Sequence, residues 1–226
     1  MRAGELELAL HDGRLVGLCH AGVEVWRNVM FLYRDPAWAT PRHVADIRKA
    51  DLRDDGFTLQ LAGACPDVPN IRWAIDIQGT AGGRICFSVD IDMRADLLTS
   101  RTGICVLHPA SAAGAPLEVE HVDGRITRSR FPQRIAPWQP FTQIRALRHR
   151  FAPGGWAICH FDGDDHEMED QRNWSDASYK TYVRSLLQPW PYTLSKGEKF
   201  IQAVHLAVAG TLSPRPASGG ERGGGG

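Results

Sequence analysis

An alternation of apolar side chains with polar or small ones restricts the fold of this sequence more than any other feature. Between Arg84 and Met93, bulky apolar side chains occupy every second position, starting at Ile85. A helix repeats every 3.6 residues and would scatter these side chains around its axis, whereas a strand repeats every two. The segment therefore predicts a β-strand with one buried face.

The same period of two recurs along the N-terminal part of the chain, at residues 6–10, 57–61 and 71–77. The glycine-rich segment 79–83 supplies residues that tolerate a positive φ, which a tight connection between two strands requires. These segments predict an antiparallel meander. Its second face carries Asp76, Asp90 and Asp92, so we expect this face to meet water or a ligand.

Further strands are expected after residue 99, at residues 104–107, 144–151, 156–161 and 199–210. The nearest candidate for a helix is 175–187, where Ser175 or Asp176 would form the N-cap. Roughly a dozen strands with little helix predict an all-β fold, a large antiparallel β-sandwich. We expect a single domain over residues 1–212 and a disordered tail rich in glycine and proline at 213–226.

The charge balance argues against several classes of partner. The 26 basic and 26 acidic residues give a net charge of zero, so no overall field attracts nucleic acid or an anionic membrane. The first residues lack the apolar core of a signal peptide, and no segment approaches the roughly 18 apolar residues of a spanning helix. We expect a cytoplasmic protein with neither nucleic acid nor membrane as a partner. Exposed strand edges offer a route to a homodimer.

Neither a metal nor another cofactor is expected. The five cysteines are widely spaced and lack CxxC spacing, so they predict reduced core residues and no structural zinc site. Asp162, Asp164, His166 and Glu167 lie close together in the sequence, which leaves a metal site as an alternative. Their order does not match the alternate positions of a calcium loop. A phosphate-binding glycine loop is also missing.

The segment 163–182 combines acids, bases, amides and aromatic rings at irregular spacing. A solvated charged surface normally repeats one or two residue types on a periodic face, so this mixture favours a functional site. A second candidate is His108, at the end of the apolar run 104–107 and directly before a proline, which forces an extended exit. A histidine that satisfies a turn carbonyl is the structural alternative for His108.

Acid–base catalysis at such a site requires a base, an acid and a group that stabilises developing negative charge. The base and acid are predicted to be His108 together with one of Glu167, Glu169 and Asp170. The substrate-binding residues are predicted to be Arg101, Arg172, Asn173, Trp174, Lys180 and Trp138. The structural alternative is that Glu169 and Arg172 form a buried ion pair that braces a loop.

Two proline-rich segments are predicted to be loops. Residues 34–43 carry Trp38, which would line a pocket or, more commonly, cover a sheet edge. Residues 131–141 contain three prolines and cannot form a helix or a central strand. This second loop carries Trp138 and is interpreted as a pocket wall, or as a packed lid without a ligand.

Several of these motifs resemble a known family. RTGICVLHP (101–109), FPQRIAPWQPF (131–141), EMEDQRNWSDASYKTY (167–182) and PWPYTLSKGE (189–198) are similar, in this order, to the N-terminal domain of the D-apionate lactonase family. The resemblance implies a galactose-mutarotase-like β-supersandwich, which family members carry in front of a TIM-barrel domain and a further β domain. It assigns no catalytic residue. Ser100 stands where the family pattern leads us to expect asparagine.

The resemblance and the candidate residues together predict a carbohydrate-active enzyme, with a small carbohydrate or sugar-acid lactone as its partner. Lactone hydrolysis by a hydrolase and acid–base chemistry at the anomeric centre of a sugar need nearly the same residues, so both stay open. The alternative is a non-catalytic carbohydrate-binding or scaffold domain that works beside a separate TIM-barrel partner. Fold-level analogy alone does not fix the activity.

Overall fold

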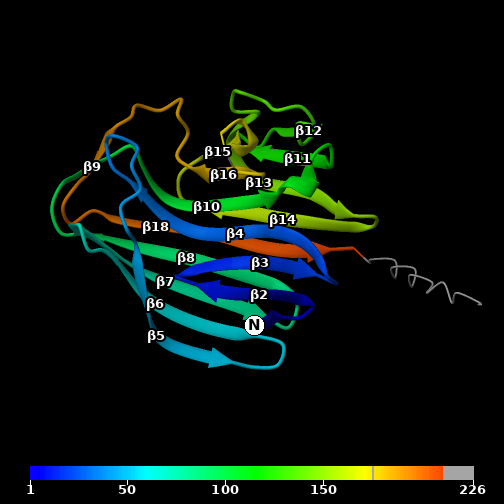
Figure 1. The fold of residues 1–226 in the computed structure, drawn as a ribbon, viewed down its shortest axis with the longest axis horizontal. Helices are drawn as coiled ribbons and strands as arrows, with labels where there is room; N and C mark the ends of the chain where they lie inside the picture. Colours follow the sequence, from blue (N-terminus) through cyan, green and yellow to red (C-terminus); the bar gives the residue numbers. More distant parts are fainter. Residues whose placement is uncertain (175, 211–226) are drawn as a thin grey trace, which may run out of the picture.

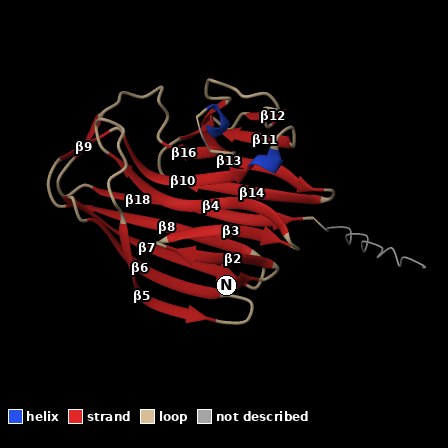
Figure 2. Ribbon diagram, in the orientation of Figure 1, coloured by secondary structure: helices blue, strands red, loops and turns tan. Residues whose placement is uncertain are grey.

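The structure is a computed structural model that describes residues 1–174 and 176–210, so the predicted tail at 213–226 lies outside the described residues, as does Ser175. Over the residues that the structure describes, two short 3-10 helices, η1 (Ala110–Ala112) and η2 (Gln171–Asn173), accompany the strands (Figure 2). The strands are β1 (Arg2–Ala3), β2 (Leu6–His11), β3 (Arg14–His20), β4 (Val23–Arg34), β5 (Val44–Leu52), β6 (Phe57–Cys65), β7 (Val68–Thr80), β8 (Arg84–Met93), β9 (Leu97–Thr99), β10 (Arg101–Pro109), β11 (Pro116–His121), β12 (Ile126–Arg130), β13 (Phe141–Ala152), β14 (Gly155–Asp162), β15 (His166–Asp170), β16 (Ser178–Val183), β17 (Tyr192–Leu194) and β18 (Lys199–Ala209). The all-β prediction is confirmed. No helix among the described residues is both long and apolar enough to cross a membrane.

Within the described residues, sixteen strands form one antiparallel sheet. Its order is β1-β2-β3-β4-β10-β16-β15-β13-β14-β18-β8-β7-β6-β5, with β11 and β12 attached beside β13, while β9 and β17 form a separate pair. The sheet curls so that its two ends face each other (Figure 1). Leu6 and Leu15 from one end therefore share a single buried cluster with Leu59 and Ile75 from the other.

The predicted meander is present as β6, β7 and β8, which pair in sequence order. Its apolar positions are buried, whereas Asp76, Asp90 and Asp92 are exposed on the other face as predicted. The first hairpin joins β2 to β3 through Asp12 and Gly13, which both have a positive φ, of 47° and 73°. This backbone suits the right-handed twist of the two strands.

The predicted helix at 175–187 is wrong, because the chain forms strand β16 there. All six of its side chains are buried, and it pairs with β10 on one side and with β15 on the other. All nine residues of β10 are buried too, and at 101–109 this strand is longer than the predicted 104–107. Strands covered on both faces lose the polar–apolar alternation that identifies a strand in the sequence.

The central strands β4, β10, β16 and β15 separate two environments. One face packs into the main core, where His108 and Val106 lie. The other face carries a small separate cluster that includes Cys105 and Tyr182. Tyr182 pairs across the strands with Cys105 and with Glu167, so these three side chains share the second face. The candidate site lies on this second face.

Candidate functional site

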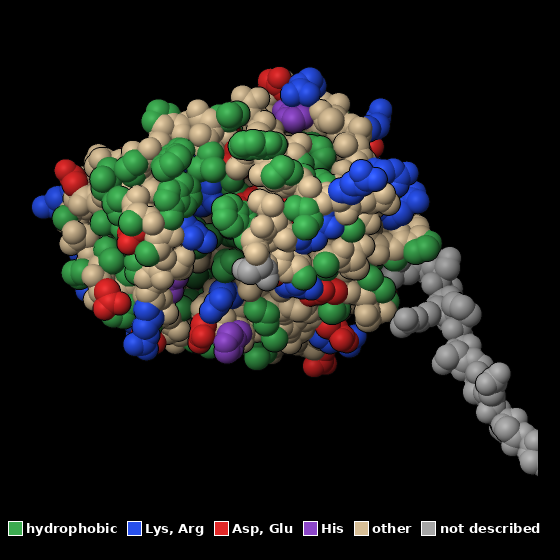
Figure 3. Space-filling view, turned by 45° about the horizontal axis from the view of Figure 1, so that its top comes forward, with side chains coloured by type: hydrophobic (Ala, Val, Ile, Leu, Met, Phe, Trp, Pro, Cys, Tyr) green, Lys and Arg blue, Asp and Glu red, His purple; other side chains and the backbone are tan. Residues whose placement is uncertain are grey.

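A cavity of about 470 Å³ lies over the second face of β10, β15 and β16. Its floor consists of polar side chains from these strands, chiefly Arg101, Glu169 and Lys180. Its walls are loop residues. Figure 3 shows hydrophobic side chains gathered on the upper part of one face of the molecule, with Lys and Arg side chains between them.

Four tryptophans from four separate loops surround this cavity: Trp38, Trp138, Trp174 and Trp190. The rings of Trp38 and Trp190 meet edge to face, with their centroids 5.1 Å apart. Trp138 and Trp174 are 81% and 69% exposed, which is unusual for so large an apolar side chain. Exposed indole faces beside buried polar groups are a typical surface for stacking against a sugar ring.

Arg101 lines the cavity and is 2% exposed. Its guanidinium carbon lies 3.2 Å from the centroid of the Tyr182 ring and 5.1 Å from that of Trp38, so the cation is held between two aromatic rings. Its Nε and Nη2 atoms are buried and have no hydrogen-bond partner among the described residues. Burial lowers the pKa of Arg101, although the nearby Tyr182 and the two glutamates of β15 act in the opposite direction.

Glu169 and Lys180 form a cross-strand pair at the floor of the cavity. They are directly opposite each other on β15 and β16, and Lys180 Nζ lies 3.2 Å from Glu169 Oε2. Lys180 Nζ also donates a hydrogen bond of 2.8 Å to Gln171 Oε1. A carboxylate and an ammonium group therefore meet where both can contact a ligand.

Glu167 lies below the cavity floor rather than in its lining. It accepts hydrogen bonds from the Tyr182 hydroxyl, from Ser185 Oγ at 2.8 Å and from Leu186 N at 3.0 Å. Burial raises the pKa of Tyr182, and the negative charge of Glu167 adds to this effect against the opposing charge of Arg101. Glu167 thus orients the ring on which the Arg101 guanidinium rests.

Asp170 and Arg172 brace the loop that carries Trp138. Arg172 Nε and Nη2 donate to the two oxygens of Asp170 at 2.8 and 2.7 Å, and Nη2 also donates to Pro132 O at 2.8 Å. Ala136 N donates to Asp170 Oδ2 at 2.9 Å. Burial opposes ionisation, but the hydrogen bonds from Arg172 and Ala136 N keep the pKa of Asp170 below its ordinary value. The loop-bracing ion pair is Asp170 with Arg172, while Glu169 pairs with Lys180.

His108 lies on the opposite face of β10 from the cavity. It is fully buried, its Nε2 is 2.9 Å from Thr181 Oγ1, and its ring contacts Phe131 and His149. Burial lowers the pKa of His108 well below its ordinary value, and His149 adds to this effect. The neighbouring Leu107 shares the face of Arg101, because side chains alternate along a strand.

The structure therefore brings most of the sequence-predicted residues to one cavity and leaves three elsewhere. The predicted residues that line it are Arg101, Trp138, Glu169, Asp170, Asn173, Trp174 and Lys180. His108, Glu167 and Arg172 do not line it. The sequence analysis missed Arg34 and Trp190. The rigid PWPY segment was a signal for Trp190, whereas nothing local distinguished Arg34.

The alternative metal residues do not come together. His166 is fully buried and stacks on Phe161 at a centroid distance of 4.1 Å, and Glu167 is occupied by its three donors. Over residues 1–174 and 176–210, no three His, Cys, Asp or Glu side chains gather in a way that would hold a metal ion.

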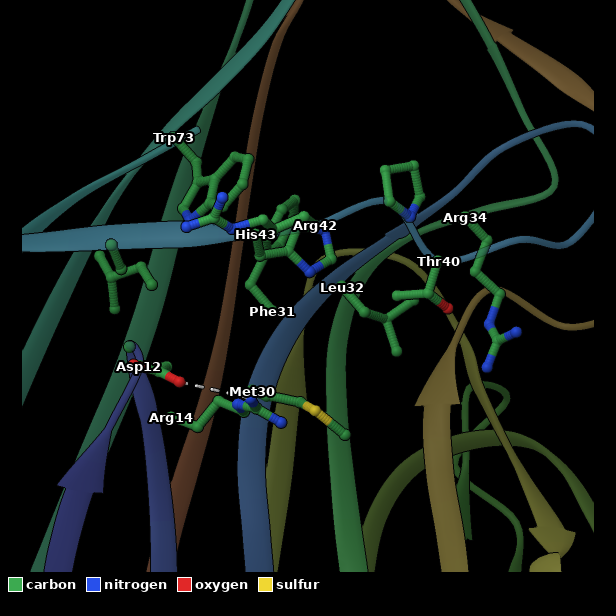
Figure 4. Close-up of a pocket in the computed structure, with 14 residues that line it drawn as sticks. Asp12, Arg14, Met30, Phe31, Leu32, Arg34, Thr40, Arg42, His43 and Trp73 are labelled. Atoms are coloured by element: carbon green, nitrogen blue, oxygen red, sulfur yellow. Dashed lines mark ion pairs between the residues drawn. The ribbon is translucent and has the colours of Figure 1, made fainter. Parts of the chain in front are cut away.

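A second cavity, of about 540 Å³, lies on the other side of residues 35–43 and shares Arg34 with the first. Figure 4 shows Arg14, Arg42 and His43 around it, with Trp73 at its wall. Arg14 pairs with Asp12 at 4.0 Å, and His43 Nε2 accepts a hydrogen bond from Tyr33 N. This cavity contains no carboxylate–ammonium pair comparable to that of Glu169 and Lys180.

The curled sheet defines the structural class. The chain superposes on galactose 1-epimerase from Lactobacillus acidophilus NCFM with a TM-score of 0.59 and 9% sequence identity, over 93% of either chain. It superposes on the Slr1438 protein from Synechocystis sp. PCC 6803 with a TM-score of 0.57 and 11% identity, over 92% of this chain and 93% of that one. The fold is thus a galactose-mutarotase-like β-supersandwich, as predicted. At these identities the likeness concerns the fold alone.

The sequence comparisons identify the family within this class. Residues 1–211 match the family model described as D-apionate lactonase, N-terminal domain. The chain is also 42% identical, over 214 residues, to D-apionate lactonase from Brucella anthropi. It therefore belongs to the D-apionate lactonase N-terminal domain family, and the resemblance seen in the motifs is confirmed. The alignment covers 93% of this chain and 35% of that relative, so the chain spans about a third of the relative's length.

Proposed function

We propose that the tryptophan-lined cavity binds a small sugar or sugar lactone and that this chain acts on its carbonyl or anomeric centre. The observation that carries the proposal is the arrangement of four tryptophans around Arg101, Glu169 and Lys180. Flat apolar rings bind the apolar face of a sugar, and the charged groups reach its oxygens. The name of the Brucella anthropi relative supports a lactone as the substrate.

In lactone hydrolysis, Glu169 accepts a proton from a water molecule as the water oxygen bonds to the carbonyl carbon. The negative charge that develops on the carbonyl oxygen is stabilised by Arg101. When the ring C–O bond breaks, Lys180 donates a proton to the leaving ring oxygen, and Glu169 returns its proton to Lys180 across their 3.2 Å contact. The products are one hydroxy acid molecule and the unchanged protein.

The same groups serve exchange at an anomeric centre. Glu169 accepts the proton of the anomeric hydroxyl and Lys180 protonates the ring oxygen, which opens the ring without a change in oxidation state. This mechanism uses no residue on the core face of β10, so His108 has no catalytic role in it.

A second candidate function is carbohydrate binding without turnover, beside a separate barrel protein. The 81% and 69% exposure of Trp138 and Trp174 favours this function, because the open rims of binding modules present such rings to their ligands. Dimer formation through the edge strand β5 is a further proposal for the assembly. Most of the β5 side chains are exposed, including Ile47 and Leu52.

The test is a proton NMR time course of the purified chain with aldonolactones and freshly dissolved aldoses. Glu169→Gln keeps the shape of the side chain but removes the base, so we expect at least about 100-fold slower turnover. Glu118→Gln is the matched control, because Glu118 also pairs with basic side chains but lies on β11, outside the cavity lining. Turnover that survives in the Glu169 variant contradicts the mechanism. Ligand binding without turnover by the parent chain selects the binding function.

A further inference from the structure

Arg101 has no ion-pair partner of its own among the described residues at the cavity floor, unlike the other charged residues that line it there. Lys180 is compensated by Glu169 at 3.2 Å. Asp170 is compensated by Arg172 at 2.7 Å. Arg101 is 2% exposed, and it forms no ion pair within 4.0 Å with any described residue. A buried guanidinium without a direct ion-pair partner in the described part of the chain therefore lines the cavity.

The acidic groups closest to Arg101 are already occupied. Glu167 accepts three hydrogen bonds, from Tyr182, Ser185 and Leu186. Glu169 binds Lys180. Arg101 itself is held by the faces of Tyr182 and Trp38, which leave its Nε and Nη2 atoms without a partner. A buried donor without an acceptor costs free energy, so an acceptor supplied by a ligand would stabilise this arrangement.

The shape and chemistry of a guanidinium specify what completes this site. A guanidinium presents parallel N–H donors that match the two oxygens of a carboxylate. The tryptophans around it suit a small sugar skeleton rather than an inorganic anion. We propose that the cavity is a receptor for the carboxylate of a sugar acid, bound by Arg101, and that it prefers the open acid to the neutral lactone or aldose.

This inference rests on the proposed function and deepens it. A lactone carbonyl is neutral in the ground state and gains negative charge as water adds to it, and the hydroxy acid product carries a full negative charge. A cation that binds the acid more tightly than the lactone therefore also favours the transition state over the substrate. The same preference predicts product inhibition.

The experiment compares three ligands that share one skeleton, by isothermal titration calorimetry at pH 7.5. The ligands are an aldonate of four to six carbons, its neutral aldonamide, and its lactone. We expect the aldonate to bind at least 10-fold more tightly than the amide or the lactone. Arg101→Met should weaken aldonate binding about 10- to 100-fold, the usual loss for a hydrogen bond to a charged group, and should leave amide binding unchanged.

Two further variants test whether the preference for the acid depends on the guanidinium of Arg101. Arg101→Lys keeps the charge without the planar donors and should retain only part of the preference for the acid. Arg42→Met is the matched control, because Arg42 is a cation of the second cavity (Figure 4) and should not affect aldonate binding. Arg101→Met should melt at the same temperature as the parent or higher, because it removes a buried unpaired cation. A structural role for Arg101 predicts the opposite change.

The outcomes separate this inference from the proposed function. Equal affinity for acid, amide and lactone overturns the inference and leaves a neutral sugar site. Loss of acid binding in the Arg42 variant, but not in the Arg101 variants, also overturns it and assigns the acid to the second cavity. If none of the ligands binds the parent chain, both the inference and the proposed function are wrong.

Discussion

The Tyr182 hydroxyl donates a hydrogen bond to the buried carboxylate of Glu167, while the centroid of its ring lies 3.2 Å from the guanidinium carbon of Arg101. One side chain thus connects a structural hydrogen bond to the binding group of the cavity. The two roles use different atoms, so they can be separated by substitution.

Tyr182→Phe should lower the free energy of unfolding by about 1–3 kcal/mol, because Glu167 loses one of its three donors in a buried position. Ligand affinity should change little, since the ring remains beneath Arg101. Tyr182→Leu should weaken binding as well, because it removes the ring. Urea denaturation and calorimetric titration of both variants measure the two effects. Equal loss of binding in Phe and Leu variants would assign the effect to the hydroxyl.

Substitutions of Asp170 and Arg172 should have strongly coupled effects on the free energy of unfolding. Arg172→Met leaves the carboxylate of Asp170, which is 0% exposed, without its partner, and should cost about 3 kcal/mol. The double variant Asp170→Asn with Arg172→Met should recover part of this loss, because no buried charge remains. Arg128→Met, in a solvent-exposed pair with Glu118, should change stability by less than about 1 kcal/mol. Additive effects of the two single substitutions, measured by denaturation, would contradict the coupling.

Strand prediction succeeded where one face meets water, and was incomplete or wrong where both faces are covered. The meander of β6 to β8 alternates and was identified in the sequence, whereas β16 is buried on both faces and resembled a short helix. For the same reason the sequence did not show which face of β10 each side chain occupies. Leu107 and His108 are both buried, and only the register with β16 places them on opposite faces.

The polar floor of the site was largely predictable, because the segment 163–182 contains several of its residues. The residues that form the walls of the cavity were harder to predict. Trp38, Trp138 and Trp190 come from loops far apart in the sequence, and the curled sheet alone brings them together. No local sequence pattern predicts that these distant tryptophans lie around one cavity. The distinction between Glu169, which lines the cavity, and Glu167, which supports its floor, likewise depends on hydrogen bonds that only the structure shows.

Buried histidines should make the protein sensitive to acid. Burial lowers the pKa of His149 to about 4 and that of His166 to about 3, from an ordinary value of 6.5. Above pH 6.5 these groups are neutral in both states and have no effect on stability. Between pH 6.5 and the folded-state values, only the unfolded chain takes up the protons. The free energy of unfolding should therefore fall by up to about 1.4 kcal/mol per pH unit for each histidine.

Urea denaturation between pH 7.5 and pH 5 measures this slope. His149→Leu should reduce this slope by the contribution of one proton, because the variant has no imidazole to protonate at this position. The His149 ring packs against Trp26, His108 and Phe131, and no side chain of the described residues forms a hydrogen bond with its Nδ1 or Nε2 atom. A slope that is the same in parent and variant would show that His149 is protonated to the same extent in both states.

Gly103 should be the least replaceable residue of β10. Its φ of 144° is unfavourable for other residues, and an added Cβ would lie 2.2 Å from both Gln202 Oε1 and Val183 Cγ1. Gln202 cannot simply move away, because its Oε1 accepts a hydrogen bond of 3.0 Å from Ile104 N. Gly103→Ala should therefore cost about 3 kcal/mol, from overpacking and backbone strain together.

The substitution should also weaken aldonate binding, because Gly103 is two residues from Arg101 on the same strand and a shift of β10 displaces the guanidinium. Gly82→Ala is the matched control, since its added Cβ would meet only Thr80 Oγ1, at 3.9 Å. Thermal melting and calorimetric titration of the two variants test both effects. A Gly103 variant as stable as the Gly82 variant would mean that Gln202 of β18 and Val183 of β16 can both shift enough to admit a methyl group. The Arg101 site would then depend far less on this close packing.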